Sequence, residues 1–165
     1  MKLRKLELKD APLMLEWMHD ESVVENLAAN FGAKKLEDCQ AFIVASQKDE
    51  ENVNLAIVDD NDEYMGTVSL KHISKENKNA EFAIAIRTCA MGKGFSKYGM
   101  KEIIRIGLED MGLYEVYWCV SPVNKRAVRF YDKNEYPRVP HDEIKCVGYT
   151  EDQIKEFIWY SVKEI

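Results

Sequence analysis

Residues Ile84 to Leu108, IAIRTCAMGKGFSKYGMKEIIRIGL, join an apolar run, two closely spaced glycines and a strongly periodic segment. The apolar run has the length and composition of a buried strand. After the glycines, the residues of one face recur at the spacing of an α-helix: Met100, Ile103, Ile104, Gly107, Leu108 and Met111. Any fold proposed for this chain must therefore contain a strand, a glycine turn and a helix in direct succession.

The junction between this strand and this helix has the features of an anion-binding site. The first N–H groups of a helix have no partners within the helix, and the helix dipole favours negative charge there. Gly92 and Gly94 would let a phosphate approach the backbone closely, and Lys93 and Lys97 add positive charge. An ordinary turn with solvated lysines explains the same letters equally well, because a short G-x-G motif is a weak signal.

Two common nucleotide-binding motifs are excluded by position. A Rossmann fingerprint would need a third glycine where Lys97 stands. A P-loop would need glycine at Arg87 and serine or threonine at Gly94. The strands that precede the glycines also read as antiparallel, unlike either fold. A nucleotide-binding protein of another fold is therefore the weakest of the functional alternatives.

Periodicity and turn signals predict the other elements of what we expect to be one domain over residues 1–165. We expect strands at 3–8, 53–60, 64–73, 80–86, 114–120 and 156–162. We expect helices after the cap Asp10, at 21–27, at 36–46, from the glycines to Met111, and after the cap Asn124. Residues 28–35 and the segment with Pro137 and Pro140 read as irregular. The order of elements predicts an α/β (α+β) fold.

Composition excludes several classes of function. The net charge of −6 and the pI of about 5.2 argue against a nucleic-acid partner, which needs a basic surface. No apolar run reaches the ~18–20 residues that cross a bilayer, so we expect no membrane partner. The N-terminus, MKLRKLELKDA, alternates and is charged, unlike a signal peptide, and a cytoplasmic location is the default expectation.

Cysteine and histidine spacing gives no metal site and no disulfide framework. The four cysteines form no C-x-x-C pair, and the three histidines are far apart in the sequence. These residues are Cys39, Cys89, Cys119, Cys146, His19, His72 and His141. We therefore expect reduced thiols and no metal. The chain also lacks a G-x-S-x-G elbow, which disfavours a hydrolase.

Two motifs at a suitable separation resemble the GNAT superfamily of acyl-CoA-dependent N-acyltransferases, and most closely its ribosomal-protein-alanine and spermidine acetyltransferase-like branch. The family's pyrophosphate loop, Gln/Arg-x-x-Gly-x-Gly/Ala, is similar to MGKGFS, with Met91 and Ser96 as departures. The segment VSPVNKRAVRFYDKNEY is similar to the family's V-x-x-x-N-x-x-A-x-x-x-Y-x-x-x-G-F, with Glu135-Tyr136 in place of Gly-Phe. The resemblance covers nearly the whole chain and implies a mixed, mostly antiparallel central sheet flanked by helices.

The resemblance implies that an acetyl group moves from acetyl-CoA to an amine by direct attack in a ternary complex. Tyr131 matches the family's general acid, and Glu81 stands where related polyamine-type enzymes carry a glutamate that helps to take a proton. The implied cofactor-binding residues are Ile84, Ala85 and Ile86, through their backbone, the loop residues Met91, Gly92, Lys93, Gly94, Phe95, Ser96 and Lys97, and Asn124.

Each implied role has a plainer alternative. Tyr131 could be a packed helix aromatic, with Tyr117, Tyr149 or Tyr160 in its place as the acid. Glu81 could belong to a solvated strand face, and Asn124 could be only a helix cap. Three acidic residues near the N-terminal helices could contact a substrate amine, although an ordinary polar helix face is the preferred interpretation: Glu16, Asp20 and Glu25.

The choice between enzyme and binding module, and the identity of the acceptor, stay open in the sequence. A non-catalytic acyl-CoA-binding or regulatory module on the same scaffold is the alternative to an N-acetyltransferase. A ribosomal protein N-terminus, a polyamine and an amino sugar all fit the resemblance as acceptors. A homodimer is the default expectation for assembly, since it is the commonest closed oligomer.

Overall fold

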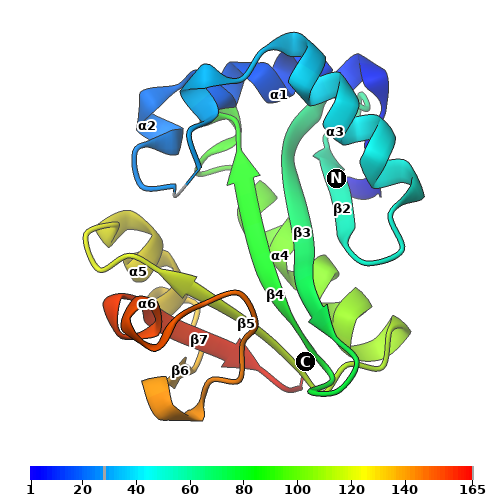
Figure 1. Ribbon diagram of the computed structural model, residues 1–165. Helices are drawn as coiled ribbons and strands as arrows, with labels where there is room; N and C mark the ends of the chain where they lie inside the picture. The colour runs from blue at the N-terminus through cyan, green and yellow to red at the C-terminus, as the bar shows by residue number, and fades with distance from the viewer. Residues whose placement is uncertain (28, 165) are drawn as a thin grey trace.

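A seven-stranded sheet forms the centre of the computed structural model, which describes residues 1–27 and 29–164 (Figure 1). The strand order is β1-β2-β3-β4-β5-β7-β6, and every neighbouring pair is antiparallel except β4 and β5. The strands are β1 (Lys2–Lys5), β2 (Val53–Val58), β3 (Tyr64–Ser74), β4 (Asn79–Ile86), β5 (Glu115–Val120), β6 (Arg138–Val139) and β7 (Ile158–Val162). The expected mixed, mostly antiparallel sheet is confirmed.

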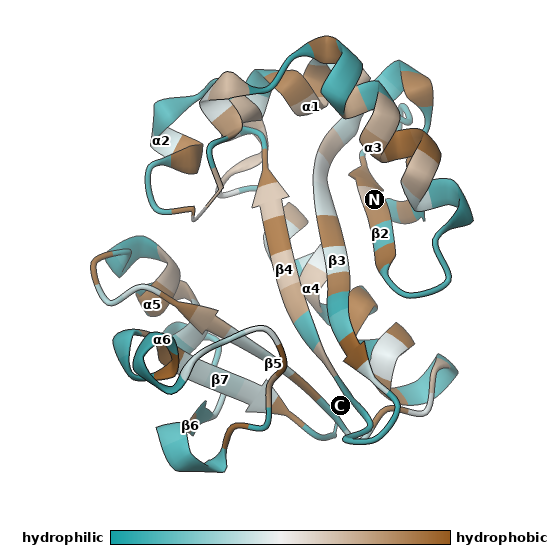
Figure 2. Ribbon diagram, in the orientation of Figure 1, coloured by the Kyte–Doolittle hydropathy of each residue, from teal (hydrophilic) through white to brown (hydrophobic). Residues whose placement is uncertain are grey.

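Helices cover both faces of this sheet. Those helices are α1 (Ala11–Met18), α2 (Glu21–Val24), α3 (Leu36–Lys48), α4 (Phe95–Arg105), α5 (Lys125–Lys133) and α6 (Glu151–Glu156). One core joins α4 and α5 to the sheet, and a second joins α1 and α3 to it. Successive strand residues point to opposite faces, so on β4 Phe82 and Ile86 enter the first core while Ala85 contacts the second. Figure 2 shows the hydrophobic residues concentrated on the central strands and hydrophilic residues in the connecting turns.

The parallel pairing of β4 with β5 is short. It joins only Asn79–Glu81 to Glu115–Tyr117, after which the two strands separate while β4 continues to Ile86 (Figure 1). A parallel pair needs a crossover, and α4 supplies it. The rings of Phe82 and Trp118, the next residues on the two strands, meet edge to face with centroids 5.6 Å apart. Among residues 1–27 and 29–164, the β5-facing edge of β4 therefore has no strand partner beyond Glu81.

The first strand is shorter than predicted, while the first helix begins after Asp10 as expected. The first strand ends at Lys5, and a 3₁₀ turn, η1 (Leu8–Asp10), replaces its expected last residue. The Asp10 carboxylate does not cap α1; it accepts hydrogen bonds from both terminal nitrogens of Arg4 and from the Glu7 N–H. The loop expected at residues 28–35 contains one 3₁₀ turn, η2 (Phe31–Ala33), and its first residue, Ala28, lies outside the described residues.

The segment expected to be irregular before the last strand contains three elements. These are β6, the 3₁₀ turn η5 (His141–Glu143) and α6. The prediction was wrong because a sequence signal was missed: Thr150 and Gln153 form a reciprocal capping box at the start of α6. Since α6 runs to Glu156, β7 begins at Ile158, later than expected.

The helix predicted up to Met111 changes its winding near its end. The α-helical part stops at Arg105, and residues Ile106–Asp110 form a π-helical turn, η4. Gly107 in this turn lies against the sheet: a Cβ there would stand 3.0 Å from a methyl group of Val116. The predicted apolar face is confirmed for Met100, Ile103 and Ile104, which are buried.

We expect Gly66→Ala to destabilise the fold. A Cβ at Gly66 on β3 would stand 2.5 Å from the Ala85 carbonyl oxygen and 2.9 Å from the Ile86 Cα. These are backbone atoms of β4, so the clash cannot be relieved without shifting the strand. Overpacking of this kind costs about 1–3 kcal/mol of unfolding free energy, which urea denaturation would measure.

Gly32→Ala is the matched control for this variant. A Cβ at Gly32 would meet only the Asn30 side chain, at 3.8 Å, so the unfolding free energy should hardly change. Equal stability of the two variants would contradict the close β3–β4 contact.

Candidate active site

The turn after β4 presents the open N-terminus of α4. Gly92 and Gly94 have φ values of 74° and 88°, in the left-handed region that favours glycine. Gly94 is the N-cap residue of α4, no side chain caps the helix, and its first turn carries no acidic residue. Phe95 is buried and anchors the first turn in the core. The N–H groups at this end of α4 are therefore available to an anion, as the sequence predicted.

The side chains around this turn divide into exposed and packed ones. Lys93 and Lys97 are exposed, and Ser96 is half-buried in the first turn of α4. Met91 is also half-buried and packs against the core beneath α4. The departure from the family pattern at Met91 thus exchanges a polar side chain for one that contributes to packing.

The free edge of β4 offers the backbone groups of alternate residues. The Arg87 N–H donates to the Met65 carbonyl at 2.8 Å, and the register pairs Ala85 with Thr67. Ala85 and Arg87 therefore direct their backbone groups to β3, while Ile84 and Ile86 direct theirs toward β5. Of the three β4 residues predicted to offer backbone groups to a cofactor, Ala85 is corrected, because its N–H and C=O belong to the β3 ladder.

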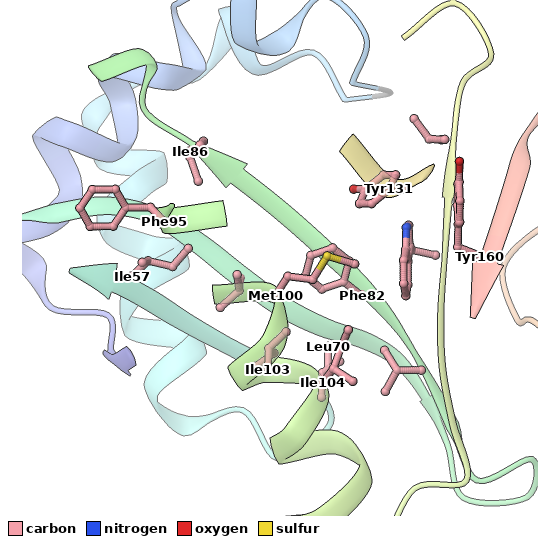
Figure 3. Packing of buried hydrophobic residues seen from close by; sticks show 14 of the residues in the cluster. Ile57, Leu70, Phe82, Ile86, Phe95, Met100, Ile103, Ile104, Tyr131 and Tyr160 are labelled. Carbon is pink, nitrogen blue, oxygen red and sulfur yellow. The ribbon is translucent and has the colours of Figure 1, made fainter. Parts of the chain in front are cut away.

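Tyr131 lies on α5 within an aromatic cluster. Its ring is 5.1 Å from Tyr160 and 5.4 Å from Trp118, and only 8% of the residue is exposed. In Figure 3 its hydroxyl points away from Tyr160, toward the β4 side. Burial raises the pKa of this phenol well above its usual value. Like other tyrosines, Tyr131 is therefore protonated at neutral pH, and its hydroxyl is a possible proton donor.

Asn124 begins the same helix. Its side-chain oxygen accepts a hydrogen bond from the Ala127 N–H at 3.3 Å, which confirms the predicted helix cap. The side-chain NH₂ group is a separate donor, so Asn124 can cap the helix and still donate a hydrogen bond to another group. Contact with a cofactor stays a prediction.

Glu81 is not part of a solvated strand face. Only 3% of the residue is exposed, and it occupies the last position at which β4 pairs with β5. One carboxylate oxygen accepts from the Tyr149 hydroxyl at 2.6 Å, and the other lies 2.7 Å from the His72 Nδ1. The Lys71 Nζ lies 3.9 Å away. The carboxyl group is therefore buried and held from two sides.

His72 and Tyr149 are the functional candidates that sequence reasoning missed. Tyr149 was considered only as a substitute for Tyr131, and the structure places it on Glu81 instead. The other two substitutes, Tyr117 and Tyr160, are buried in aromatic packing. His72 reaches Glu81 because the β3–β4 register shifts between Lys71 and Ser74. No local sequence signal marks that irregularity.

A cavity of about 640 Å³ lies between α1, α3 and the sheet face that carries Glu81. Its helical side is mostly apolar and includes Met14, Trp17, Phe31 and Phe42, while its sheet side includes Asn54, Thr67, Ser69, Lys71 and Ala83. Two lysines and two aspartates line it in all: Lys34, Lys71, Asp38 and Asp49. The cavity therefore combines an apolar wall with a polar floor and balanced charge.

The three acidic residues proposed near the N-terminal helices do not line this cavity. Glu16 accepts two hydrogen bonds from the buried guanidinium of Arg87, which ties α1 to the end of β4. Asp20 caps α2 and accepts a hydrogen bond from the Thr88 hydroxyl. Glu25 is exposed. The preferred interpretation, an ordinary polar helix face, fits Glu25, whereas Glu16 and Asp20 bind Arg87 and Thr88.

Residues 1–27 and 29–164 contain neither a candidate membrane span nor a candidate metal site. No helix there combines the length and the apolar composition needed to cross a membrane. Those residues also contain no group of three or more His, Cys, Asp or Glu side chains that could hold a metal ion. A reaction without a metal cofactor stays a prediction.

Comparison with known proteins identifies the family of this chain. Residues 1–136 match the model of the acetyltransferase (GNAT) domain. The chain is 25% identical over 139 residues to the uncharacterized N-acetyltransferase p20 of Bacillus licheniformis, covering 82% of this chain and 78% of that protein. It is 28% identical over 137 residues to the spermidine N(1)-acetyltransferase of Escherichia coli (strain K12), covering 80% and 70%.

Solved structures agree on the fold. The spermidine N-acetyltransferase from Vibrio cholerae, in complex with CoA and spermine, superposes with a TM-score of 0.76 at 18% identity, covering 97% of this chain and 92% of that one. At this identity the likeness concerns the fold alone. The family match spans most of the chain and includes the splayed strands, the glycine turn and Tyr131. The chain therefore belongs to the GNAT acetyltransferase family and is an N-acetyltransferase that uses acetyl-CoA to acetylate an amine.

Proposed function

We propose that acetyl-CoA lies along the free edge of β4, and that a primary amine reaches its thioester from the cavity beside α1 and α3. One observation carries the proposal: β4 leaves β5 after Glu81, and its free edge runs to the open N-terminus of α4. A backbone-like chain such as pantetheine can pair with a free strand edge. A pyrophosphate can then meet the helix N–H groups.

The chain has the groups needed to hold acetyl-CoA in this way. Ile84 and Ile86 direct N–H and C=O groups to the free edge, and the glycine turn from Met91 to Lys97 offers N–H groups and two exposed lysines. Asn124 stands at the start of the facing helix with its NH₂ group as a further donor. These residues orient the thioester, and holding two reactants in place supplies much of the rate enhancement in a ternary complex.

Acid and base candidates lie on opposite faces of β4. Tyr131 contacts the core of the α4 face, whereas Glu81 shares its face with Lys71 and Ala83 beside the cavity. We assign Tyr131 to protonate the sulfur as the C–S bond breaks. We assign Glu81 to take a proton from the incoming ammonium group, directly or through water, so that the amine can attack. Because the sheet separates them, the two groups do not neutralise each other.

Among the three candidate acceptors, a polyamine has the best support. Two of the named relatives are a spermidine N(1)-acetyltransferase and a spermidine N-acetyltransferase. The apolar wall formed by Trp17 and Phe31 suits methylene segments, and Asp38 and Asp49 can meet a second ammonium group. Lys34 and Lys71 in the same lining favour an acceptor with few charges. We therefore propose a short polyamine, ahead of a peptide N-terminus or an amino sugar.

The oligomeric state, the excluded partners and the cellular location stay predictions. A homodimer is proposed only as the commonest closed oligomer. The acidic net charge supports the proposal that neither nucleic acid nor a membrane is a partner. A cytoplasmic location is proposed on the charged, alternating N-terminus.

An acceptor panel tests the proposed function. Release of free CoA thiol from acetyl-CoA would be followed with spermidine, a ribosomal-type peptide N-terminus and glucosamine. We expect the highest kcat/KM with spermidine. Saturable binding of acetyl-CoA without thiol release in the presence of any amine would favour the non-catalytic binding module instead.

We expect Gly94→Val to weaken CoA binding. Valine is strained at a φ of 88° and places a branched side chain where the phosphates approach the backbone. The affinity measured by calorimetry should fall about tenfold or more, the equivalent of one lost charge-assisted hydrogen bond. Gly112→Val is the control, because Gly112 has a φ of 69° and open space around it in a different turn. An equal loss of affinity in both variants would show that the phosphates of CoA do not bind at this turn.

We expect Tyr131→Phe to lower kcat by about 10²-fold or more, the scale of a lost general acid. The ring packing is retained, so the melting temperature and CoA affinity should hardly change, and the deficit should persist at saturating substrate. Tyr136→Phe removes a hydroxyl from the same aromatic cluster and should keep its kcat. If thiol release by Tyr131→Phe equals that of the wild type with a good acceptor, Tyr131 serves packing alone.

A further inference from the structure

A buried base needs a route for the proton it takes. One carboxylate oxygen of Glu81 accepts a hydrogen bond from the Tyr149 hydroxyl, the other lies 2.7 Å from the His72 Nδ1, and 3% of the residue is exposed. A proton accepted there must leave before the next turnover. We propose that His72 carries this proton from Glu81 to solvent, which makes His72 a positioning and proton-transfer residue of the acetylation site. The proposal rests on the assignment of Glu81 as the base under the proposed function.

Among the side chains that contact Glu81 in the described part of the chain, His72 is the one that can accept its proton. Burial, with the nearby Glu81 carboxylate, raises the pKa of the Tyr149 phenol far above neutrality, so Tyr149 only donates. The Lys71 ammonium group, 3.9 Å away, has no lone pair to offer while it is charged. An imidazole can accept and release a proton near neutral pH. The His72 Nδ1 lies 2.7 Å from the Glu81 oxygen, within reach for direct transfer.

The backbone at His72 is shaped to bring its ring to Glu81. Successive strand residues point to opposite faces, so a regular strand with Lys71 on the Glu81 face would direct residue 72 away from it. The register shift between Lys71 and Ser74, with a φ of 50° at His72, turns the ring back to the same face. Bulges that re-aim a side chain occur next to active sites, and positive φ is uncommon for a residue other than glycine.

The loop before α6 fixes the ring from its other side. A Cβ at Gly148 would stand 3.4 Å from the Cε1 and Nε2 of His72, and the Tyr149 ring meets the imidazole edge to face with centroids 6.0 Å apart. The Asn79 side chain donates to the Lys145 carbonyl at 2.6 Å and holds this loop against β4. His72 is thus held by β3, β4 and the loop together.

The far side of the imidazole meets solvent. The His72 side chain is 37% exposed and lines an open hollow on the surface together with Glu50, Glu51 and Lys75. These residues and Lys71 are the charged groups around the ring besides Glu81. The ring therefore connects a buried carboxylate at one nitrogen with water at its exposed side.

In each turnover, one proton leaves the site through Glu81 and His72. The ammonium group of the acceptor gives a proton to Glu81, which passes it to the unprotonated Nδ1 of His72, and the imidazolium releases its Nε2 proton to water. Exchange with water then moves the ring proton from Nδ1 back to Nε2, so that Nδ1 can accept again. The neutral amine forms the C–N bond as the C–S bond breaks, and the sulfur takes a proton from Tyr131. The nitrogen then loses its second proton, which restores Tyr131 through water. Each turnover therefore releases one net proton.

His72→Asn tests the route. Asparagine tolerates positive φ and offers an NH₂ donor to Glu81, but it cannot carry a proton. We expect kcat with spermidine to fall about 10-fold or more while KM for acetyl-CoA stays near wild type. Added imidazole should restore much of the lost kcat in a concentration-dependent way and leave the wild type unchanged. A purely structural role would not produce such rescue.

Tyr149→Phe is the matched control, because it removes the other hydrogen bond to Glu81 and leaves His72 in place. Its rate should not depend on added imidazole. His72→Gln, with CoA affinity and melting temperature measured beside kcat, replaces His72→Asn if the latter does not fold. A kcat of the His72 variant within about twofold of the wild type, or a loss that imidazole does not relieve, overturns the route. If the wild type itself acetylates no amine, the proposed function fails, which is a different result from an active wild type with an imidazole-independent variant.

Discussion

The short parallel pairing between β4 and β5 is the constraint on which the site depends. Three residue pairs hold the two strands together, and the strands separate after Glu81 and Tyr117. A longer ladder would have used the backbone groups of Ile84 and Ile86. The aromatic rings of Phe82 and Trp118 fill the point where the strands part. The free edge thus exists because large side chains, rather than backbone hydrogen bonds, occupy the space next to it.

The crossover helix places the second half of the site. Because β4 and β5 are parallel, the chain must return through α4, and the N-terminus of α4 necessarily follows the end of β4. The glycines at 92 and 94 complete the turn between them with positive φ values. Arg87, bound by Glu16 and Glu63, holds the end of β4 to α1 and to the β2–β3 turn. The free edge and the open helix terminus are consequently joined by a well-fixed connection.

The alternation of side chains along β4 separates two chemical environments. Residues on the α4 face pack with Tyr131 in an aromatic and aliphatic core, where burial keeps the phenol protonated. Residues on the other face include Glu81, which contacts Tyr149 and His72 and has Lys71 nearby. One strand therefore has a buried phenol on one side and a buried carboxyl group on the other, which a single loop could not keep apart.

Local patterns in the sequence predicted the glycine turn and the helices α4 and α5. The one-faced helix after the glycines, the turn itself and the Asn124 cap are each determined by neighbours within a few residues, and the structure has all three. One prediction was wrong because a side chain contacts another element instead of its own helix. Asp10 looks like a helix cap in the sequence, but it binds Arg4 on β1. The helix α6 was missed even though its capping box was present in the sequence.

Local patterns were enough to predict most of the elements, the glycine turn and the helix that carries Tyr131, because backbone propensity, glycine conformation and helical periodicity act over short distances. Tertiary packing determines where β4 leaves β5, which backbone groups of β4 remain free, and how Glu81 is held. His72 and Tyr149 lie 9 and 68 residues from Glu81 in the chain. The contacts of His72 and Tyr149 with Glu81 depend on a bulge in β3 and on the loop before α6. Neither feature could be predicted from neighbouring residues in the sequence.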